Sequence, residues 1–402
     1  MQTSISRASR MSTQASTNLK LSAVSGTTIV IVMTALHFVN DNFTSLLTPL
    51  QPDIARAFNV TKVETGILVS LLALVGSVLQ PMFGGLGDRF DRRYLAAAGP
   101  MLSALGMTMM GVAPNLWLLG LFVIVGGIGS AVFHPSGAAF VASNSKLERR
   151  GFYASIFSAG GTAGLSLGPL TAGALGFHGI IYLLPVGILM GIVAFVLTPS
   201  TKTSSSKVKT LQDYLSVFQG PIRLLWAVSV LRSLSTVTYQ SLIPYVFDSR
   251  NLRHHIGWTL FTFSIASALG GIVGGLLSDR VGRTKVLRSS VLGLIPLFIL
   301  LVLSNPDQLW FYPLAFLVGG LANATIPVAV VAAQEFAPEH SGTTSALMMG
   351  FSWGTAGMLY LAFAALANVT SPSLAMIVSI VLLVPGFFLT LKIPEPPRSI
   401  IK

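Results

Sequence analysis

Apolar stretches of about 20 residues recur along the chain, and short polar segments separate them. A helix of ~20 residues crosses the ~30 Å hydrocarbon core of a bilayer. Because lipid offers no partners to backbone polar groups, a segment inside it must satisfy its own hydrogen bonds, as a helix does. The pattern predicts an all-α membrane protein with twelve transmembrane helices, at about residues 26–48, 63–86, 94–113, 116–142, 151–175, 179–198, 222–246, 256–278, 286–304, 309–335, 342–367 and 372–391.

The composition excludes several classes of protein. Apolar residues make up 52% of the chain and charged residues 9%, whereas soluble domains carry about 25% charged residues. The chain has no cysteine, so disulfides, thiolate nucleophiles and Cys-ligated metal sites are excluded. No Gly-x-x-x-x-Gly-Lys-Ser/Thr loop and no Ser-His-Asp or paired-carboxylate arrangement is visible. We expect a protein that is not an enzyme and that needs neither a cofactor nor a metal.

The basic residues predict the orientation in the membrane. Of 25 Lys and Arg, 20 fall in the tails and loops on the N-terminal side, four fall in the opposite loops, and Arg232 lies within a predicted span. Cytoplasmic loops are enriched in Lys and Arg, so both termini are expected in the cytoplasm. The net charge of +12 is then a topology signal, and we expect no nucleic-acid partner.

The same pattern predicts the domain organisation. Residues 1–24 are polar and lack the apolar core of a signal peptide, which indicates a disordered cytoplasmic tail. Residues 25–198 are expected to form an N-terminal six-helix bundle and residues 221–392 a C-terminal one. A Ser-rich, basic cytoplasmic linker, residues 199–220, joins the two, and residues 393–402 form a second cytoplasmic tail.

Two pairs of segments repeat about half a chain length apart. Residues 84–93 read GGLGDRFDRR and residues 275–283 read GLLSDRVGR. A second echo relates residues 160–164, GGTAG, to residues 353–357, WGTAG. The repeats indicate six spans followed by six related spans. In the first loop Asp91 occupies the place of a glycine, so the turn there is less free to adopt positive φ.

The twelve predicted spans, the repeat and the doubled D-R-x-G-R loop resemble the major facilitator superfamily. Residues 37–41 (HFVND), 133–139 (FHPSGAA) and 164–169 (GLSLGP) are similar to the fosmidomycin-resistance branch of bacterial drug efflux proteins, and the last to the motif of proton-coupled drug antiporters. The resemblance implies a monomeric secondary active transporter of the inner (plasma) membrane. It implies proton-coupled antiport, by alternating access, that exports a small drug-like, anionic or phosphonate-like compound.

Asp41 is the only acid deep inside a predicted span. A carboxylate at the bilayer centre costs ~2.5–3.5 kcal/mol on insertion scales, and such residues usually mark ion pathways. His37 lies one turn earlier on the same helix face, and Asn40 is adjacent. We predict that Asp41 carries the proton and His37 modulates it, while Asn40 contacts the substrate; the alternative is a structural pair that fastens two helices.

Arg232 is the only cation deep inside a predicted span. When spans one and seven are aligned on Pro49 and Pro244, Arg232 falls opposite His37. We expect Arg232 either to pair with Asp41 or to bind an anionic group of the substrate, for which a guanidinium is well suited.

Further side chains are candidates for the substrate cavity. His134 precedes a helix-breaking proline and can titrate near neutral pH, but it lacks a second ligand at i+3 or i+4 and so gives no metal signal. A hydrogen-bonded core histidine is the alternative. For the aromatic candidates, contact with lipid or with another helix is the alternative. The predicted substrate-binding set is completed by Tyr239, Gln240, Phe133, Phe157 and Trp353.

The repeated loops and the glycines suggest moving parts. The resemblance implies that Asp88, Arg89 and Arg92, and in the second half Asp279, Arg280 and Arg283, latch one conformation on the cytoplasmic side. The alternative for the arginines is plain topology. Gly164, Gly168 and Pro169 are expected to form a seam that seals one half against the other, or to serve only close packing.

Two other functions fit the same sequence. A protein of the same fold could import a metabolite with protons, or let it pass without coupling. A membrane sensor that binds ligand without turnover would need a signalling domain, and the 24-residue polar start is too short to fold alone.

Overall fold

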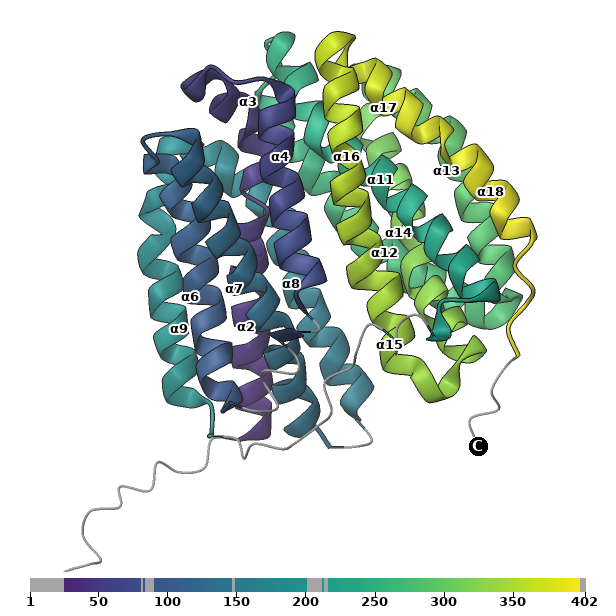
Figure 1. Cartoon of the computed structure of the whole chain (residues 1–402), viewed down its shortest axis with the longest axis horizontal. Coiled ribbons are helices and arrows are strands. Elements are labelled where there is room, and N and C mark those ends of the chain that lie inside the picture. The colour runs from purple at the N-terminus through teal and green to yellow at the C-terminus, as the bar shows by residue number, and fades with distance from the viewer. Residues whose placement is uncertain are drawn as a thin grey trace, which may run out of the picture.

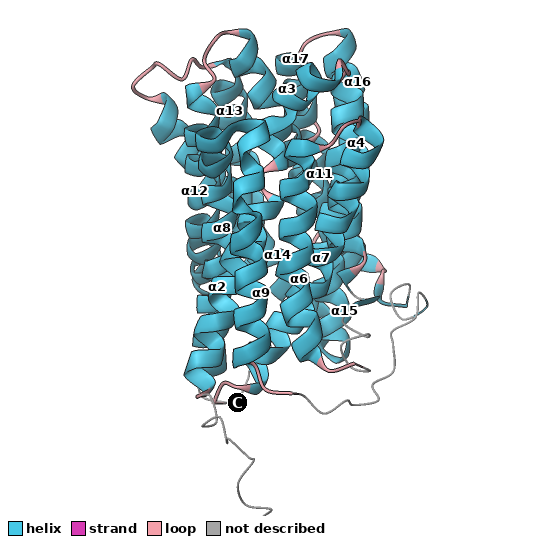
Figure 2. Ribbon diagram, turned by 90° about the vertical axis from the view of Figure 1, so that its left-hand side faces the viewer, coloured by secondary structure: helices cyan, strands magenta, loops and turns pink. Residues whose placement is uncertain are grey.

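The computed structural model describes residues 25–80, 82–83, 90–146, 149–200, 212 and 216–397. The described residues form helices and connecting turns, without a strand. The helices run alongside one another in two halves, and Figures 1 and 2 show the molecule from two directions. The start of α2 and the described residues that follow α18 lie toward one end, which we call the termini end; α3 lies at the other, which we call the far end.

The first half contains α2 to α9. Its helices are α2 (Gly26–Thr44), α3 (Leu47–Phe58), α4 (Lys62–Ala73), α6 (Arg92–Met109), α7 (Leu116–Ser143), α8 (Arg150–Gly179) and α9 (Leu184–Leu197). The second half contains α11 to α18. Its helices are α11 (Gly220–Ser249), α12 (His254–Val281), α13 (Arg283–Leu303), α14 (Phe311–Phe336), α15 (Ser341–Ala346), α16 (Ser352–Val369), α17 (Pro372–Val381) and α18 (Leu383–Leu391).

Nine helical segments among the described residues are long and apolar enough to cross a membrane. One of them, Phe152–Leu197, covers two of the predicted spans. The predicted span at 63–86 is absent from the nine because it runs into residues outside the described part, and the span at 222–246 because Arg232 and many hydroxyl side chains lower its hydropathy. The count of twelve, the two six-helix bundles and the cytoplasmic termini stay predictions.

Several helices are interrupted where the sequence expected a simple span. The first predicted span breaks between Thr44 and Leu47, so that α2 and α3 meet at a kink. A π-helical turn at Leu74–Val78 follows α4, and another at Leu347–Phe351 precedes α16. The two π-turns lie against each other across the halves. Such turns often mark functional places because they loosen the helix hydrogen-bond ladder.

Between the predicted spans that end at residue 175 and begin at residue 179, the structure has a kink at Gly176. Its φ of 68° and ψ of 175° lie outside the helical region, and helical residues resume up to Gly179. A glycine tolerates this positive φ without steric cost. The contrast between the repeated loops follows the same rule, because Gly282 has a φ of 107° while Asp91 keeps a φ of −61° and caps α6 through its side chain.

Glycine allows the helices to pack closely within each half. A Cβ on Gly106 would lie 2.2 Å from the backbone of Gly126, and one on Gly270 would lie 2.0 Å from the carbonyl oxygen of Gly320. Without side chains at these crossings, α6 approaches α7 and α12 approaches α14. The close packing holds the helices of each half in fixed positions. The polar residues of the site described below lie between these helices.

Candidate functional site

A buried carboxylate between two histidines forms the centre of the first half. The Asp41 Oδ2 atom lies 3.2 Å from His37 Nε2 on the same helix. The Asp41 Oδ1 atom lies 3.3 Å from His134 Nε2 on α7. The side chains of His37 and Asp41 are 10% and 7% exposed, whereas that of His134 is 26% exposed. We call these three residues the Asp41 cluster.

Backbone carbonyls determine how the imidazoles present their nitrogens. His37 Nδ1 lies 2.8 Å from the carbonyl oxygen of Phe157, and His134 Nδ1 lies 2.8 Å from that of Ser130. A carbonyl only accepts, so each Nδ1 carries a proton and donates it. A neutral imidazole with its proton on Nδ1 has a bare Nε2. Both Nε2 atoms therefore face Asp41 as acceptors, and each contact becomes attractive only when an additional proton lies in it.

Neighbouring side chains hold Asp41 in place. Asn40 donates through Nδ2 to Asp41 Oδ1 at 2.9 Å, and the Asn40 Oδ1 atom accepts from Ser103 Oγ on α6 at 2.8 Å. Asn40 is fully buried and does not line the cavity described below; in this structure it orients the carboxylate, and its predicted contact with substrate stays a prediction. Phe157 and Phe133 pack on His37, with ring centroids 4.2 Å and 5.8 Å from the imidazole.

Arg232 does not pair with Asp41, which corrects one of the two expectations for it. Its Nη1 donates to the carbonyl oxygen of Ala322 at 3.0 Å and its Nη2 to Ser233 Oγ at 2.6 Å. The guanidinium lies 5.6 Å from the centre of the Trp353 ring. The residue is 2% exposed, its Nε has no hydrogen-bond partner, and no carboxylate of the described residues pairs with it. The charge is therefore buried without a counter-ion, a costly state.

Arg232 lines a cavity of 370 Å³ that both halves share. Hydroxyl and amide side chains dominate the polar part of its wall, and Trp353, Leu165, Leu260 and Pro169 supply apolar surface. The polar lining comes from α2, α3 and α8 on one side and α11, α12 and α14 on the other: Thr44, Ser45, Thr48, Thr162, Arg232, Thr236, Gln240, Ser264, Ser267 and Asn323. A polar pocket with one uncompensated cation suits a small anionic ligand.

The predicted substrate residues divide between cavity and core. Gln240 and Trp353 line the cavity with Arg232. Tyr239 does not line it: it is fully buried and packs on Phe263 and Phe298, with ring centroids 5.3 Å and 5.1 Å away. His134, Phe133 and Phe157 do not line this cavity and instead surround His37.

Sequence reasoning missed the cavity hydroxyls because they carry no distinctive signal. Thr236 donates to the carbonyl of Arg232, and Ser267 to that of Phe263, each one turn earlier. Such bonds satisfy a hydroxyl anywhere in a membrane helix. The hydroxyls that line the cavity therefore look the same in the sequence as those that face lipid or another helix.

The second repeated loop forms an ion-paired cluster at the termini end. Arg283 contacts Asp279 at 2.5 Å and Glu335 on α14 at 3.1 Å. Glu395 accepts from the backbone nitrogens of Arg283 and Thr284 at 2.6 Å and 3.1 Å, and so caps α13. Arg280 lies in the last turn of α12. The latch role predicted for Asp279, Arg280 and Arg283 stays a prediction.

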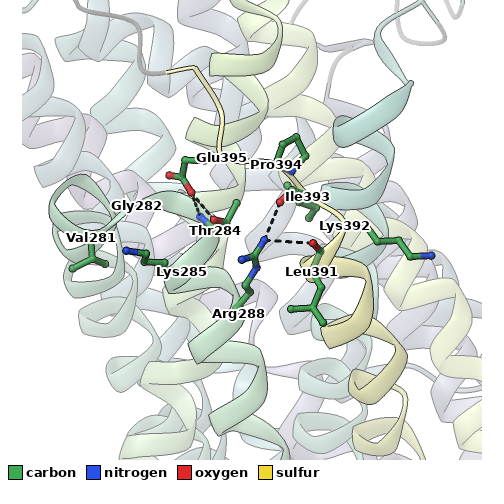
Figure 3. Close-up of a pocket in the computed structure, with 10 residues that line it drawn as sticks. All are labelled: Val281, Gly282, Thr284, Lys285, Arg288, Leu391, Lys392, Ile393, Pro394 and Glu395. Atoms are coloured by element: carbon green, nitrogen blue, oxygen red, sulfur yellow. Dashed lines mark hydrogen bonds between the residues drawn. The ribbon is translucent and has the colours of Figure 1, made fainter.

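A pocket of 560 Å³ borders this loop, but its basic residues do not converge (Figure 3). Arg288 donates to the carbonyl oxygens of Leu391 and Ile393 at 3.5 Å and 3.1 Å. The side chains of Lys285 and Lys392 point away from each other. The pocket thus lies where the segment after α18 is hydrogen-bonded to α13, away from the cavity that Arg232 lines.

In the first repeated loop, Asp88 and Arg89 lie outside the described residues. Arg92 is the first residue of α6, and Asp91 caps that helix by accepting from the backbone nitrogen of Arg93 at 3.0 Å.

The glycines of α8 face α2 of the same half, which corrects the expected seam between halves. A Cβ on Gly164 would lie 2.1 Å from the carbonyl oxygen of Phe38, and one on Gly168 would lie 1.7 Å from Ser45 Oγ. A Cβ on Gly161 would lie 2.3 Å from His37 Nε2. Contact with the second half comes instead at Pro169, whose carbonyl oxygen approaches Gly257 of α12.

Within the part of the chain that the structure describes, two groups of side chains have donor atoms within 4.8 Å of one another, close enough for a metal ion: the Asp41 cluster and His254, His255 and Asp307. The Asp41 cluster arises because α7 brings His134 to α2, which local sequence spacing does not reveal. Its hydrogen-bonded contacts need protons, which a metal ion would have to displace. In the second group His255 already contacts Tyr312 and Asp307 at 2.6 Å and 3.0 Å.

Long apolar helices, and a polar cavity that two halves share, are features of membrane proteins that move small molecules across the bilayer. The comparisons with known proteins agree. The sequence profile of the Major Facilitator Superfamily matches residues 33–253 and 225–402. The chain belongs to this superfamily and is a transporter, not an enzyme.

Relatives confirm the resemblance to the drug-efflux branch. The chain is 28% identical over 362 residues to an uncharacterized MFS-type transporter, YfnC, of Bacillus subtilis, which covers 85% of this chain and 86% of that protein. It is 26% identical to the fosmidomycin resistance protein of Escherichia coli, with 80% and 82% covered. It is 27% identical to the multidrug resistance protein MdtG of Escherichia fergusonii, with 70% and 74% covered.

Solved structures share the fold. A bacterial homologue of the human lysosomal transporter Spinster, in an inward-facing and unoccupied conformation, has a TM-score of 0.77 at 14% identity, with 92% of this chain and 97% of that chain covered. The human organic anion transporter MFSD10 has a TM-score of 0.66 at 17% identity, with 90% and 98% covered.

Proposed function

We propose that this transporter exports small organic anions across the plasma membrane in exchange for protons. The Asp41 cluster is the proton site, and the cavity around Arg232 is the substrate site. Both termini lie in the cytoplasm, so the far end faces outward. The efflux direction is supported by the relatives named for resistance to fosmidomycin and to several drugs.

The assignment of the proton site is supported by the two unprotonated Nε2 atoms that face one carboxylate. Without an added proton, lone pairs oppose lone pairs at both contacts, 3.2 Å and 3.3 Å long. One proton makes one contact attractive, and a second proton makes both attractive. The geometry of the cluster therefore depends on how many protons it holds, as a coupling site requires.

The observation that supports an anionic substrate is the uncompensated charge of Arg232. A buried guanidinium that lacks a carboxylate partner and leaves Nε unbonded favours a ligand that brings a negative charge and an acceptor. Hydroxyl and amide groups around it can bond further oxygens of that ligand, and Trp353 can cover an apolar face. The volume of 370 Å³ restricts the ligand to small molecules.

Helix α2 connects the two sites. Asp41 lies in its last turn, and Thr44, Ser45 and Thr48 line the cavity where α2 breaks before α3. Thr44 Oγ1 also donates to the carbonyl oxygen of Asp41 at 3.2 Å. A change in the contacts of Asp41 thus reaches the cavity wall within one helical turn. Because Arg232 bonds to Ala322 and Ser233 and not to Asp41 in this structure, the coupling that we propose runs through α2.

Charge alone favours a second arrangement, proton–anion symport. A protonated cluster is more positive, so it attracts an anion in the neighbouring cavity. Exchange instead requires that the kink between α2 and α3 adopt different conformations in the protonated and the substrate-bound states. The direction of proton movement therefore decides between export by antiport and import by symport.

The test is flux in proteoliposomes that contain a pH-sensitive dye, with imposed gradients of phosphonates, sugar phosphates and lipophilic drugs. We expect an anion of the panel to move while protons move the opposite way, and the Arg232→Gln variant to lose the anion flux. Protons that move with the anion would establish symport. Flux of uncharged or cationic compounds alone would refute the assignment of Arg232.

A further inference from the structure

Four charged side chains meet at the far end, where the two halves touch. Asp53 and Arg56 come from α3 in the first half, Asp248 from the end of α11, and Arg253 from the residue before α12. Sequence reasoning counted the two arginines only as basic residues of outer loops. We call these four residues the far-end ring.

Each charge in the ring has one partner in its own half and one across the seam. Within the halves, Arg56 Nη2 lies 2.7 Å from Asp53 Oδ1, and Arg253 Nε lies 3.2 Å from Asp248 Oδ1. Across the seam, Arg56 Nη1 contacts Asp248 Oδ2, and Arg253 Nη2 contacts Asp53 Oδ1. Positive and negative charges therefore alternate around a closed ring of four.

This arrangement makes the seam separable. If the halves move apart, the two contacts across the seam break, but Arg56 keeps Asp53 and Arg253 keeps Asp248. No charge is left without a partner, so opening avoids the large penalty of an unpaired ion. The arginines are 48% and 51% exposed and the aspartates about 20%, hence each contact is of the modest, solvent-exposed kind.

Neutral contacts lie next to the ring on the same seam. Gln51 Nε2 donates to the carbonyl oxygen of Ser241 at 3.2 Å. Tyr245 contacts both Thr65 Oγ1, at 2.5 Å, and the carbonyl oxygen of Gln51, at 3.3 Å. The far end is thus closed in this structure by the ring and by a group of neutral hydrogen bonds.

The ring also borders the way from the cavity to the far end. A pocket of 610 Å³ lies between α3, α8 and α12, and Asp53 and Arg253 form part of its wall. Pro169 lines both this pocket and the central cavity. A molecule that moves from the cavity into this pocket would therefore meet the ring.

We propose that the far-end ring is an exchangeable latch that sets the equilibrium between the states closed and open at the far end. This inference rests on the proposed transport by alternating access, not on the identity of the substrate or on proton coupling. Two exposed contacts across the seam favour the closed state by roughly 2- to 30-fold. A bias of this size keeps both states accessible, as a transport cycle needs.

Charge exchange within one half tests the latch. The double variant Asp53→Arg/Arg56→Asp keeps the pair within α3 but places like charges opposite each other across the seam. The double variant Asp248→Arg/Arg253→Asp does the same from the other side. Combining all four substitutions restores opposite charges at every contact. Arg250→Asp, an exposed neighbour outside the ring, is the matched control.

The readout is the distance between spin labels at Ala57→Cys and Ser249→Cys, exposed positions next to the ring. The chain has no cysteine, so labels attach only there. We expect the short-distance population to fall by at least about fivefold in each double variant and to return in the fourfold variant. Recovery in the fourfold variant also shows that the substitutions leave the fold intact.

Unchanged populations in both double variants, or a fourfold variant that stays open, would overturn the latch. The distances are measured without substrate and without a proton gradient. Their outcome is therefore independent of whether the protein exchanges protons for anions, which the flux assay above decides.

Discussion

Gly161 separates α8 from the imidazole of His37, and a single methyl group there should disturb the Asp41 cluster. A Cβ at this position would lie 2.3 Å from His37 Nε2, 2.5 Å from Cε1 and 2.6 Å from Cδ2. These distances are shorter than any ordinary contact. The ring is bonded to the carbonyl of Phe157, one turn before Gly161 on the same helix, and it packs on the ring of Phe133. We therefore expect Gly161→Ala to force His37 out of its present place.

The size of the effect follows from these distances. The imidazole must retreat by about 1 Å to restore an ordinary contact of 3.4 Å. We expect this shift to lengthen its 3.2 Å contact with Asp41 beyond hydrogen-bonding range. A hydrogen bond to a charged group contributes ~1.5–3 kcal/mol. Its loss changes the proton affinity of the cluster by about tenfold to more than a hundredfold. Overpacking itself costs ~1–3 kcal/mol of stability.

The assay is proton-driven transport in proteoliposomes, together with ligand binding to the same preparation. We expect Gly161→Ala to lower driven transport at least tenfold while binding in the cavity changes less than about threefold, because Gly161 does not line it. Gly173→Ala is the matched control on the same helix, since a Cβ there meets nothing within 4 Å. Normal driven transport by a well-folded Gly161→Ala protein would refute the assignment of His37 to coupling.

Three other substitutions test separate parts of the structure. Arg232→Gln should weaken anion binding at least tenfold by titration, because the buried cation of the cavity is lost, whereas Arg280→Gln at the termini end should leave it unchanged. Ser103→Ala should lower the free energy of unfolding of the purified protein by ~1–3 kcal/mol, since it removes the donor to the buried Asn40 Oδ1. Ser289→Ala, at an exposed position, should lower it far less. Glu335→Gln should destabilise the Arg283 cluster more than Asp279→Asn does, because Glu335 is 11% exposed and Asp279 62%; equal losses in a melting assay would contradict this.

The sequence predicted the part of the proton site that lies on one helix, His37 and Asp41, but not the contact with His134 on another helix. An acid inside an apolar span stands out, and the spacing of His37 and Asp41 places them on one helix face. His134 lies on another helix, and which face of α7 meets α2 depends on close helix crossings such as that of Gly99, where a Cβ would lie 2.6 Å from Phe133 Cβ. That contact depends on three-dimensional packing, which one sequence does not reveal.

The predicted pair between Arg232 and Asp41 was wrong for a related reason. Aligning spans one and seven gives their relative height in the membrane but not the direction of each side chain. Asp41 turns toward the interior of its own half, where it accepts from Asn40 and faces the two histidines. Arg232 instead faces the cavity between the halves.

The far-end ring could not be foreseen because its members are ordinary loop-end charges in the sequence. Asp53 and Asp248 are 195 residues apart, and only the meeting of α3 with the end of α11 brings them together. The repeated D-R-x-G-R loops, by contrast, are visible as a motif. In the first copy part of the loop lies outside the described residues, so only the second copy can be placed structurally.

The most direct test of the proposed exchange is proton release on substrate binding, measured with a pH dye on purified protein in weakly buffered detergent solution. The account predicts that binding of the transported anion expels protons, and that Asp41→Asn binds the anion without expelling them. Proton uptake on binding, or release that persists undiminished in Asp41→Asn, would contradict it.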